Sequence, residues 1–460
     1  MPKYILIAGS YADPEPVGGN RTIAMQAMAL KGLGQHLELL TWPFKDTWKG
    51  PTPVLQNGEI AGVPYLEVSR AGMNYHVVAC PPIWSERVLT EKEWEAAVEW
   101  GMAALDRLQP SLVHLQFWQN LWWILESANR LGIPTAYSAH DYGIGCLRTI
   151  LVMGNDTLCD AGVSVEKCSR CIMSGRNMLG KCNEWAAQFP FADRLLSLAF
   201  GAQADGGLAR RQGVRLPVRR RVRLNLERCG RVLSRLKALI AASPFAGGFF
   251  TQFGVPAERI HILPWFYAQN KLAKGFPDTR EAITLAMVTR ISPEKGVHVL
   301  LEALKQTKAA RPLKVKIAGT IEGNSYAEAL ALRYPNRAGD HEISWSGWVP
   351  NGKLDEFYAD VHVVALPSLW YDNTPLSLVE ALANGRPVIC TDVPSMTHLV
   401  RHGHNGLAFP MGDAAKLARC IEQVVDTPGL IEKFAGNTRN VPSVTEYATR
   451  LASVYSKVLS

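Results

Sequence analysis

Two segments in the second half of the chain carry charged side chains at spacings that could bind a ligand. In the first, Arg290 and Lys295 stand five residues apart behind an apolar stretch, and Pro293 between them is typical of a helix's first turn. Two cations beside a helix N-terminus attract an anion, because backbone N–H groups and the helix dipole add to their charge. The segment therefore predicts a diphosphate site; the alternative is an ordinary surface loop with an incidental basic pair.

The second segment places two carboxylates eight residues apart, Asp372 in a loop and Glu380 inside the helix that follows. Carboxylates accept hydrogen bonds from hydroxyl groups, so two at this spacing could bind two polyols, a hexose and a ribose. Neither needs to be a nucleophile. The helix start also offers backbone groups to a phosphate or a sugar hydroxyl. These backbone positions are Asn373, Thr374, Pro375 and Leu376.

The first half of the chain offers weaker candidates. Gly18 and Gly19 follow the first expected strand, and two glycines let the backbone approach a phosphate or an acceptor closely. A plain turn has the same composition. His140 follows the end of another expected strand, where it could contact a substrate, although a lone histidine is more often a structural residue.

Five of the nine cysteines are clustered in the first half. Cys146, Cys159, Cys168 and Cys171 supply four thiolates, enough for a closed tetrahedral zinc site. Only the last pair has the short spacing that is typical of such sites. We expect a structural zinc in preference to an iron–sulfur cluster, and the alternative is a group of reduced thiols without a metal. Cys182 is the fifth member and is surplus to the four.

Residues 210–237 contain eleven Arg or Lys residues and one acidic residue, Glu227. Such a block is either a solvated face or a site for an anionic partner, with lipid headgroups ahead of nucleic acid. Within it, residues 224–236 have the pattern of a basic amphipathic helix that packs on the first domain or lies on a membrane surface. We expect an anionic membrane surface as a partner of residues 210–237 and no nucleic acid.

Strands alternate with helices along most of the chain, which is typical of α/β proteins with doubly wound parallel sheets. The 460 residues suit two such domains. We expect a first Rossmann-like domain at 1–270 with an insertion at 145–235, a second at 281–435, and a terminal helix within 436–460 that could pack on either. Since ligands bind beyond the carboxyl ends of strands, the expected site is a cleft between the two domains.

Composition narrows the class of protein. The chain is 47% hydrophobic and 20% charged, as in folded globular proteins, with a formal charge of +8. No apolar run reaches the length of a membrane span, and the N-terminal apolar stretch is too short for a signal peptide. The expected location is therefore the cytoplasm, with peripheral attachment to the inner face of the membrane through the basic block.

The charged segments of the second half resemble those of the retaining GT-B glycosyltransferases of family four. Arg290 and Lys295 are similar to the family's phosphate-binding pair. Asp372 to Glu380 resembles its acidic-x7-Glu motif, and residues 381–389 match the run that follows it. The cysteine cluster is similar to an insertion found in a subset of the family. The chain departs from the family at one position of this motif: most members have Glu where it has Asp372, whose side chain is one methylene shorter.

The resemblance implies a role for each residue. Glu380 would bind the donor ribose, the Asp372 loop would bind the transferred sugar, and Arg290 and Lys295 would neutralise the leaving diphosphate. His140 would contact the sugar near its anomeric centre, and the glycine loop would lie beside the donor phosphate and the acceptor. No catalytic metal is expected, because the two cations supply the positive charge.

The expected function is transfer of a hexose from a GDP- or UDP-linked donor to a glycan or lipid-linked acceptor, in polysaccharide or glycolipid biosynthesis. The alternative is a non-catalytic relative whose Cys/Arg-rich insertion binds RNA or a protein partner. A third interpretation keeps the fold and changes the chemistry, as phosphorylases and epimerases do, but no pyridoxal-type lysine context supports a phosphorylase.

Overall fold

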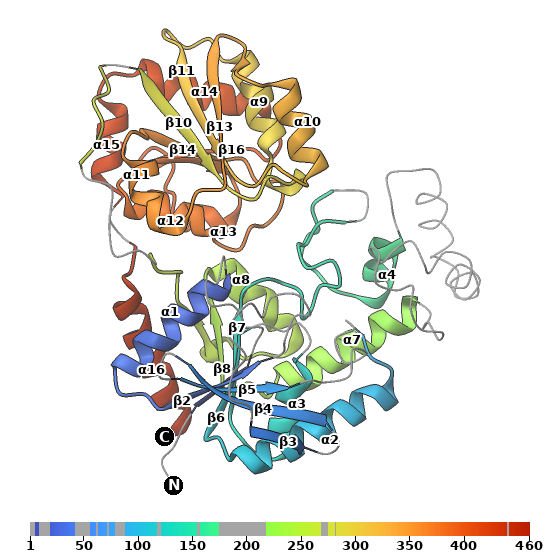
Figure 1. Ribbon diagram of the computed structural model, residues 1–460. Helices are drawn as coiled ribbons and strands as arrows, with labels where there is room; N and C mark the ends of the chain where they lie inside the picture. Colours follow the sequence, from blue (N-terminus) through green and yellow to red (C-terminus); the bar gives the residue numbers. More distant parts are fainter. Residues whose placement is uncertain are drawn as a thin grey trace. The chain divides into compact units, whose positions relative to one another are not determined.

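The computed structural model describes most of the chain as helices, strands and ordered connections (Figure 1). The ranges described are 5–8, 19–41, 56–60, 63–70, 73–78, 88–116, 121–153, 157–173, 218–267, 275–280, 282–438 and 441–460.

The described contacts divide the chain into two compact units. The first unit comprises Met1–Leu263 together with Thr445–Ser460, and the second comprises Pro264–Val444. The chain therefore leaves the first unit once and returns to it with its last helix, α16 (Val444–Leu459), which the sequence had not assigned to either domain.

The first unit is built on a nine-stranded sheet of order β3-β4-β5-β2-β1-β6-β7-β8-β9 among the described residues. Its strands are parallel except that β4 runs antiparallel to both β3 and β5. The strand order reverses between β1 and β6, the switch point of a Rossmann-like sheet. The strands are β1 (Ile5–Ala8), β2 (Leu37–Thr41), β3 (Gln56–Ile60), β4 (Val63–Arg70), β5 (Met73–Val78), β6 (Leu112–Leu115), β7 (Thr135–Ala139), β8 (Ala238–Ala241) and β9 (Ile260–Ile262).

Helices connect these strands, and their ends follow local sequence signals. Helix α2 begins behind Thr90, whose hydroxyl accepts a hydrogen bond from the Glu93 N–H while the Glu93 carboxylate accepts one from the Thr90 N–H, a capping box. Within the described part of the first unit, the helices before α16 are α1 (Gly19–Gly32), α2 (Glu91–Leu108), α3 (Trp123–Arg130), α4 (Val165–Met173), α7 (Val218–Leu233) and α8 (Pro244–Phe249).

In the second unit the described residues form a seven-stranded sheet of order β12-β13-β11-β10-β14-β15-β16, parallel except for β12 at its edge. Its order also reverses once, between β10 and β14, so this sheet has the Rossmann pattern as well. The strands are β10 (Ile283–Val288), β11 (Leu313–Ala318), β12 (Arg337–Ala338), β13 (His341–Gly347), β14 (Val363–Leu366), β15 (Val388–Thr391) and β16 (Gly406–Phe409).

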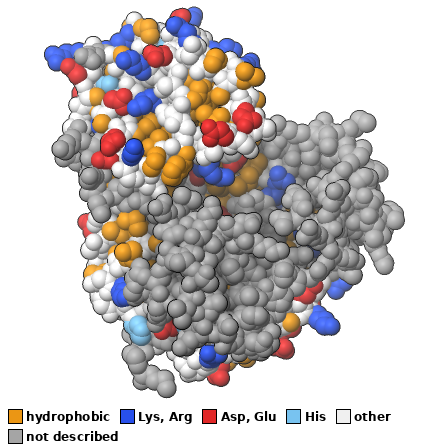
Figure 2. All heavy atoms as spheres, viewed as in Figure 1, with side chains coloured by type: hydrophobic (Ala, Val, Ile, Leu, Met, Phe, Trp, Pro, Cys, Tyr) orange, Lys and Arg blue, Asp and Glu red, His pale blue; other side chains and the backbone are white. Residues whose placement is uncertain are grey.

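Both faces of the second sheet are covered, because successive side chains of its strands enter two separate hydrophobic clusters. Leu285 packs with α9, α10, α14 and α15, whereas the adjacent Ala286 packs with α11, α12 and α13 (Figure 1). These helices are α9 (Val297–Gln306), α10 (Ser325–Arg333), α11 (Leu354–Tyr358), α12 (Leu376–Ala383), α13 (Pro394–Thr397), α14 (Ala414–Asp426) and α15 (Leu430–Gly436). On the face drawn in Figure 2, basic and acidic side chains are interspersed over this unit.

The structure confirms one of the placements expected for the basic amphipathic helix, packing of its apolar face on the first domain, and the segment is not a wholly solvated face. Helix α7 packs its apolar residues into the unit, including Cys229, Val232 and Leu233. Arg228 lies among them with only 1% of its surface exposed. The apolar face therefore has an intramolecular partner, and the residues left on the surface are arginines such as Arg220 and Arg223.

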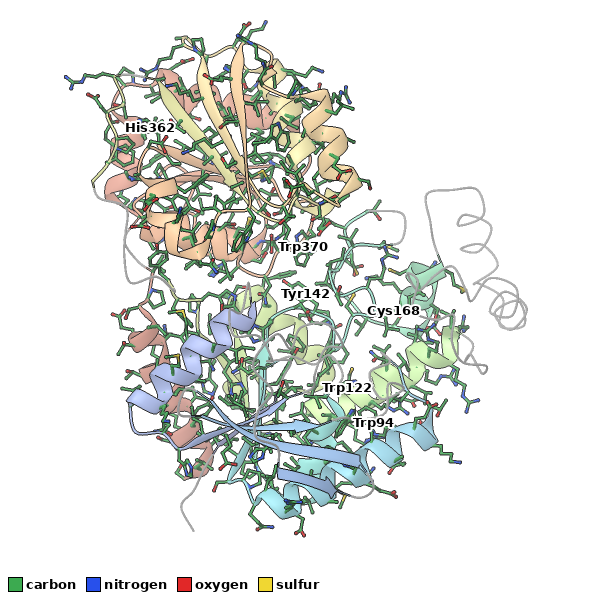
Figure 3. All side chains as sticks on the ribbon, in the orientation of Figure 1. Trp94, Trp122, Tyr142, Cys168, His362 and Trp370 are labelled. Atoms are coloured by element: carbon green, nitrogen blue, oxygen red, sulfur yellow. The ribbon has the colours of Figure 1, made fainter. Side chains whose placement is uncertain are left out.

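The guanidinium of Arg228 makes a hydrogen bond, an ion pair and a cation–π contact. It donates to the Leu89 carbonyl at 2.7 Å, pairs with Glu91 at 3.3 Å, and stacks on the Trp94 ring with 4.6 Å to its centroid. Trp94 in turn contacts Trp122, with the ring centroids 4.5 Å apart (Figure 3). The guanidinium thus ties α7 to the start of α2, although burial lowers its pKa from the ordinary value.

We predict that Arg228→Ala lowers the free energy of unfolding by on the order of 3 kcal/mol, because it removes packing and a buried hydrogen bond together. Arg223→Ala, the same change at an exposed position of the same helix, should stay within about 0.5 kcal/mol of the parent. Urea unfolding measures both. Equal losses in the two variants would contradict a structural role for Arg228.

Candidate functional site

The two charged segments found in the sequence follow neighbouring strands of the second sheet. Strands β10 and β14 are paired in parallel, and the strand order reverses between them. Residues 289–296 follow β10 and residues 367–375 follow β14, so both loops leave the carboxyl edge of the sheet at its switch point. That edge is where open α/β sheets bind ligands.

Backbone contacts join the two loops. The Leu369 N–H donates to the Glu294 carbonyl at 2.8 Å. Gly296 has φ of +75°, and a Cβ atom there would lie 1.9 Å from the Pro367 carbonyl oxygen. Only glycine fits such an approach, so Gly296 is the residue that lets the basic loop contact the acidic one.

The joined loops bring Lys295 and Asp372 into an ion pair. Both side chains are nearly enclosed, with 13% and 7% of their surfaces exposed. Ser368 donates to Asp372 Oδ2 at 3.1 Å, and Lys295 binds the same oxygen. The Lys295 ammonium also lies 5.2 Å from the centroid of the Trp370 ring (Figure 3). Among the described residues both side-chain contacts of Asp372 thus fall on Oδ2, and Oδ1 remains to accept from a ligand hydroxyl.

Arg290 occupies the open side of the basic loop. Its side chain is 76% exposed and donates to Glu294 Oε1 at 3.3 Å. The Ser292 hydroxyl donates to the same oxygen at 2.6 Å. An exposed pair of this kind contributes little to stability, so Arg290 can exchange Glu294 for a stronger anion. The predicted helix from Pro293 is divided here: a 3-10 turn, Pro293–Lys295, precedes α9, which begins at Val297.

The segment between the two predicted carboxylates contains a strained residue. Thr374 has φ of +53°, in the left-handed region that β-branched residues seldom adopt. Its hydroxyl donates to the Ser395 carbonyl at 3.2 Å, and the Trp265 indole N–H donates to the Asn373 carbonyl at 3.3 Å. Such strain persists only where surrounding contacts impose it, and it concentrates at binding sites.

Helix α12 begins immediately after this segment. Pro375 is its N-cap residue and forms no side-chain capping bond, and the helix begins at Leu376. Leu378, Val379, Ala381 and Leu382 are buried, whereas Glu380 is only partly buried. Glu380 therefore lies on a more exposed face of α12 than Val379 and Ala381, the residues on either side of it in the sequence.

In the first unit, His140 follows β7, and Gln116 follows the adjacent parallel strand β6. The His140 Nε2 and Gln116 Oε1 atoms are 2.8 Å apart. Burial lowers the pKa of His140 to about 3, so its imidazole is neutral near pH 7. The sequence analysis did not identify Gln116; its place directly after a strand at the switch point was the available signal.

For the two glycines predicted to lie beside the donor phosphate, the structure describes only Gly19. Gly18 lies outside the described residues, and Gly19 is the first residue of helix α1 rather than part of a loop.

The four cysteines predicted to bind zinc all lie within the described residues, and Cys182 lies outside them. None of the four forms a disulfide. Burial raises the pKa of Cys168, with a smaller contribution from Cys146 and Cys159, so each of these two thiols is within electrostatic range of Cys168. Across the described ranges, however, no three His, Cys, Asp or Glu side chains are gathered as a metal requires. The described conformation does not fit a zinc ion, and zinc stays a prediction.

Two family models match the chain. "Glycosyl transferase 4-like domain" covers residues 17–265, more than half of the chain, and "Glycosyl transferases group 1" covers residues 270–441. Among curated proteins, the MMP alpha-(1->4)-mannosyltransferase of Mycolicibacterium hassiacum is 24% identical over 48% of this chain and 54% of its own length. The chain spans about half the length of the curated relatives it matches.

Solved structures share the whole architecture. Sucrose-phosphate synthase from Thermosynechococcus elongatus matches with a TM-score of 0.63 at 18% identity, covering 99% of both chains. HepE from Anabaena, solved in complex with UDP-glucose, matches with a TM-score of 0.57 at 15% identity, covering 99% of each chain. The predicted two-Rossmann GT-B fold is therefore confirmed.

We predict that Gly296→Ala separates the two loops. The added methyl group collides with the Pro367 backbone and also strains a left-handed residue, at a cost of about 2–5 kcal/mol. Gly403→Ala is the matched control, since Gly403 has φ of +74° but open space around its Cβ position, and it should cost about 1 kcal/mol. Thermal unfolding compares the two, and similar losses would show that the close approach is unimportant.

Proposed function

Because the chain belongs to the glycosyl transferase 4-like family and carries a glycosyl transferases group 1 domain, we propose that it transfers a hexose from a nucleotide-diphosphate sugar, GDP- or UDP-linked, to a glycan or lipid-linked acceptor. We propose retention of the anomeric configuration, which the resemblance to family four implies. Polysaccharide or glycolipid biosynthesis is the expected setting.

One observation carries the proposal: the loops after β10 and β14 are joined at the switch point, where Lys295 pairs with the carboxylate of Asp372 and Arg290 lies on the same basic loop. A nucleotide sugar has an anionic diphosphate between two polyols. Cations beside the start of α9 and carboxylates around the start of α12 match those two chemistries.

Lys295 is the residue that connects the two functions of the site. Its ammonium has three donors, so it can keep Asp372 Oδ2 and also donate to a phosphate oxygen. Arg290 can exchange its exposed contact with Glu294 for the same diphosphate. In the proposed reaction the leaving phosphate gains negative charge as the glycosidic bond breaks, and these two cations stabilise that charge.

His140 then acts as a hydrogen-bonding group rather than as a base. With a pKa of about 3, its imidazole is not in the protonated, cationic form near pH 7, so it is not a general acid, and it is a weak base. It can orient a sugar or acceptor hydroxyl. The proposed mechanism therefore consists of positioning and electrostatic stabilisation, without an enzyme nucleophile.

The second candidate function is a non-catalytic relative that binds RNA or a protein through the Cys/Arg-rich insertion. The ordered arrangement around Lys295 and Asp372 favours the transferase, because two enclosed charges and a strained Thr374 are costly to keep without a ligand.

We predict that a nucleoside diphosphate raises the melting temperature and that Lys295→Ala weakens this binding about tenfold or more, the effect of losing one charge-assisted contact. A thermal-shift panel of GDP, UDP, ADP and their sugars identifies the nucleotide, and calorimetry gives the affinities. Lys305→Ala, which removes a lysine from an exposed pair with Glu302 in the same unit, should bind like the parent.

The transferase and the non-catalytic relative are separated by turnover. The transferase should hydrolyse its donor slowly without an acceptor, and Glu380→Ala should abolish this activity while Glu302→Ala leaves it unchanged. A flat thermal response to every nucleotide and no donor hydrolysis would overturn the proposal.

We also propose that the surface arginines of α7 attract an anionic membrane. No helix within the described residues is long and apolar enough to cross a bilayer. Because the apolar face of α7 is packed inward, attachment would be electrostatic rather than by insertion. The exposed residues concerned are Arg220, Arg223 and Arg231 of α7 and Arg235, which lies just after the end of the helix. Each contributes about 1 kcal/mol near an anionic surface at low salt.

We predict flotation with phosphatidylserine vesicles at low salt, lost at high salt and absent with phosphatidylcholine vesicles. Changing the four exposed arginines to glutamine should remove most of the binding. The matched control changes four exposed basic residues of the second unit to glutamine: Lys305, Lys308, Arg333 and Arg337. Equal flotation of both variants would refute a role for α7.

A further inference from the structure

A line of hydrogen-bonding side chains runs through the first unit from its last helix to His140. The Tyr455 hydroxyl of α16 lies 2.6 Å from His114 Nδ1. Gln116 Nε2 lies 3.4 Å from the same nitrogen, and Gln116 Oε1 lies 2.8 Å from His140 Nε2. His114 Nε2 completes the set at 2.9 Å from the Ser138 hydroxyl.

The line is enclosed. His114, Gln116 and Ser138 are each 0% exposed, and Tyr455 is 1% exposed. Hydrogen bonds among such groups must be satisfied inside the protein, because water cannot replace them. Burial lowers the pKa of His114 to about 3 and raises that of Tyr455, so both are neutral near pH 7. The protons of the line therefore occupy fixed positions.

The chemistry of each group assigns those positions. The Gln116 carbonyl oxygen can only accept, so His140 Nε2 must carry a proton and donate to it. The Gln116 NH2 group can only donate, so the His114 nitrogen facing it carries no proton. The Tyr455 hydroxyl then donates to His114 Nδ1, and His114 Nε2 donates to Ser138.

We propose that Gln116 is a positioning residue that fixes His140 as the Nε2–H tautomer, and that Tyr455 orients the Gln116 amide through His114. In that tautomer Nδ1 of His140 carries the lone pair, so it accepts hydrogen bonds rather than donating them. The tautomer assignment is independent of the proposed function. Its consequence, that Nδ1 accepts a hydrogen bond from a sugar or acceptor hydroxyl, rests on that function.

Nitrogen-15 NMR of the full chain tests the assignment directly, because protonated and unprotonated ring nitrogens give separate signals. His140→Gln and His114→Gln identify the two rings by loss of their signals. In the parent, His140 should show a protonated Nε2 and an unprotonated Nδ1 at pH 7. The reverse pattern in the parent would overturn the proposal whatever the enzyme does.

Two substitutions of Gln116 then distinguish a role as hydrogen-bond acceptor for His140 from a role in packing alone. Gln116→Glu keeps an acceptor oxygen and should keep the Nε2–H tautomer. Gln116→Leu has similar volume but no acceptor, and should give a mixture of tautomers. If transfer occurs as proposed, Gln116→Leu lowers kcat about tenfold with little change in KM, as expected for one lost hydrogen bond, and Gln116→Glu restores part of it.

Two substitutions in α16, one of them a control, test the proposed effect of Tyr455 on the histidine rings. Tyr455→Phe removes the hydroxyl that donates to His114 and should shift the His114 ring signals and partly those of His140. Tyr447→Phe removes a buried hydroxyl from the same helix outside the line and should shift neither. An unchanged His140 tautomer in both Gln116→Leu and Tyr455→Phe would refute the positioning role, and it would do so without bearing on donor binding.

Discussion

The close approach of two backbone segments in the second unit is the constraint on which the charged site depends. Gly296 lies against the Pro367 carbonyl, and Leu369 donates to the Glu294 carbonyl, so the loops after β10 and β14 are held as one surface. The pairing of those strands sets the spacing, and the glycine allows the contact. Lys295 and Asp372 meet as a result, although 77 residues separate them in the sequence.

The sequence could predict where the charged residues of the second unit lie, because the signals for their positions are local. Arg290 and Lys295 stand directly after one strand, and Asp372 and Glu380 bracket a helix start, so strand ends alone place them at one edge. The ion pair between Lys295 and Asp372 was not predictable in the same way. It depends on which strands are neighbours and on the Gly296 contact, and neither follows from residue spacing.

The first unit shows the opposite case, because burial there is decided by tertiary packing. Arg228 has the same local context as the exposed arginines of α7, and only its position opposite Trp94 makes it a core residue. Gln116 is one residue beyond a short strand and has no motif. Its function depends on Tyr455, which is supplied by the returning end of the chain. The composition of the basic block alone therefore cannot tell the buried Arg228 from the exposed arginines beside it.

The two candidate sites differ in charge: the second unit has cations that are paired with carboxylates, and the first unit has a neutral histidine. In the second unit every cation described at the loops already has a carboxylate, Lys295 with Asp372 and Arg290 with Glu294. In the proposed function a diphosphate competes with these internal anions, and of the two pairs the exposed Arg290 pair is weak enough to exchange at small cost. Lys295 must instead share, because moving it away would leave Asp372 buried and unpaired. The second unit thus offers paired charges at its candidate site, whereas His140 in the first unit is neutral, hydrogen-bonded and adds no charge of its own.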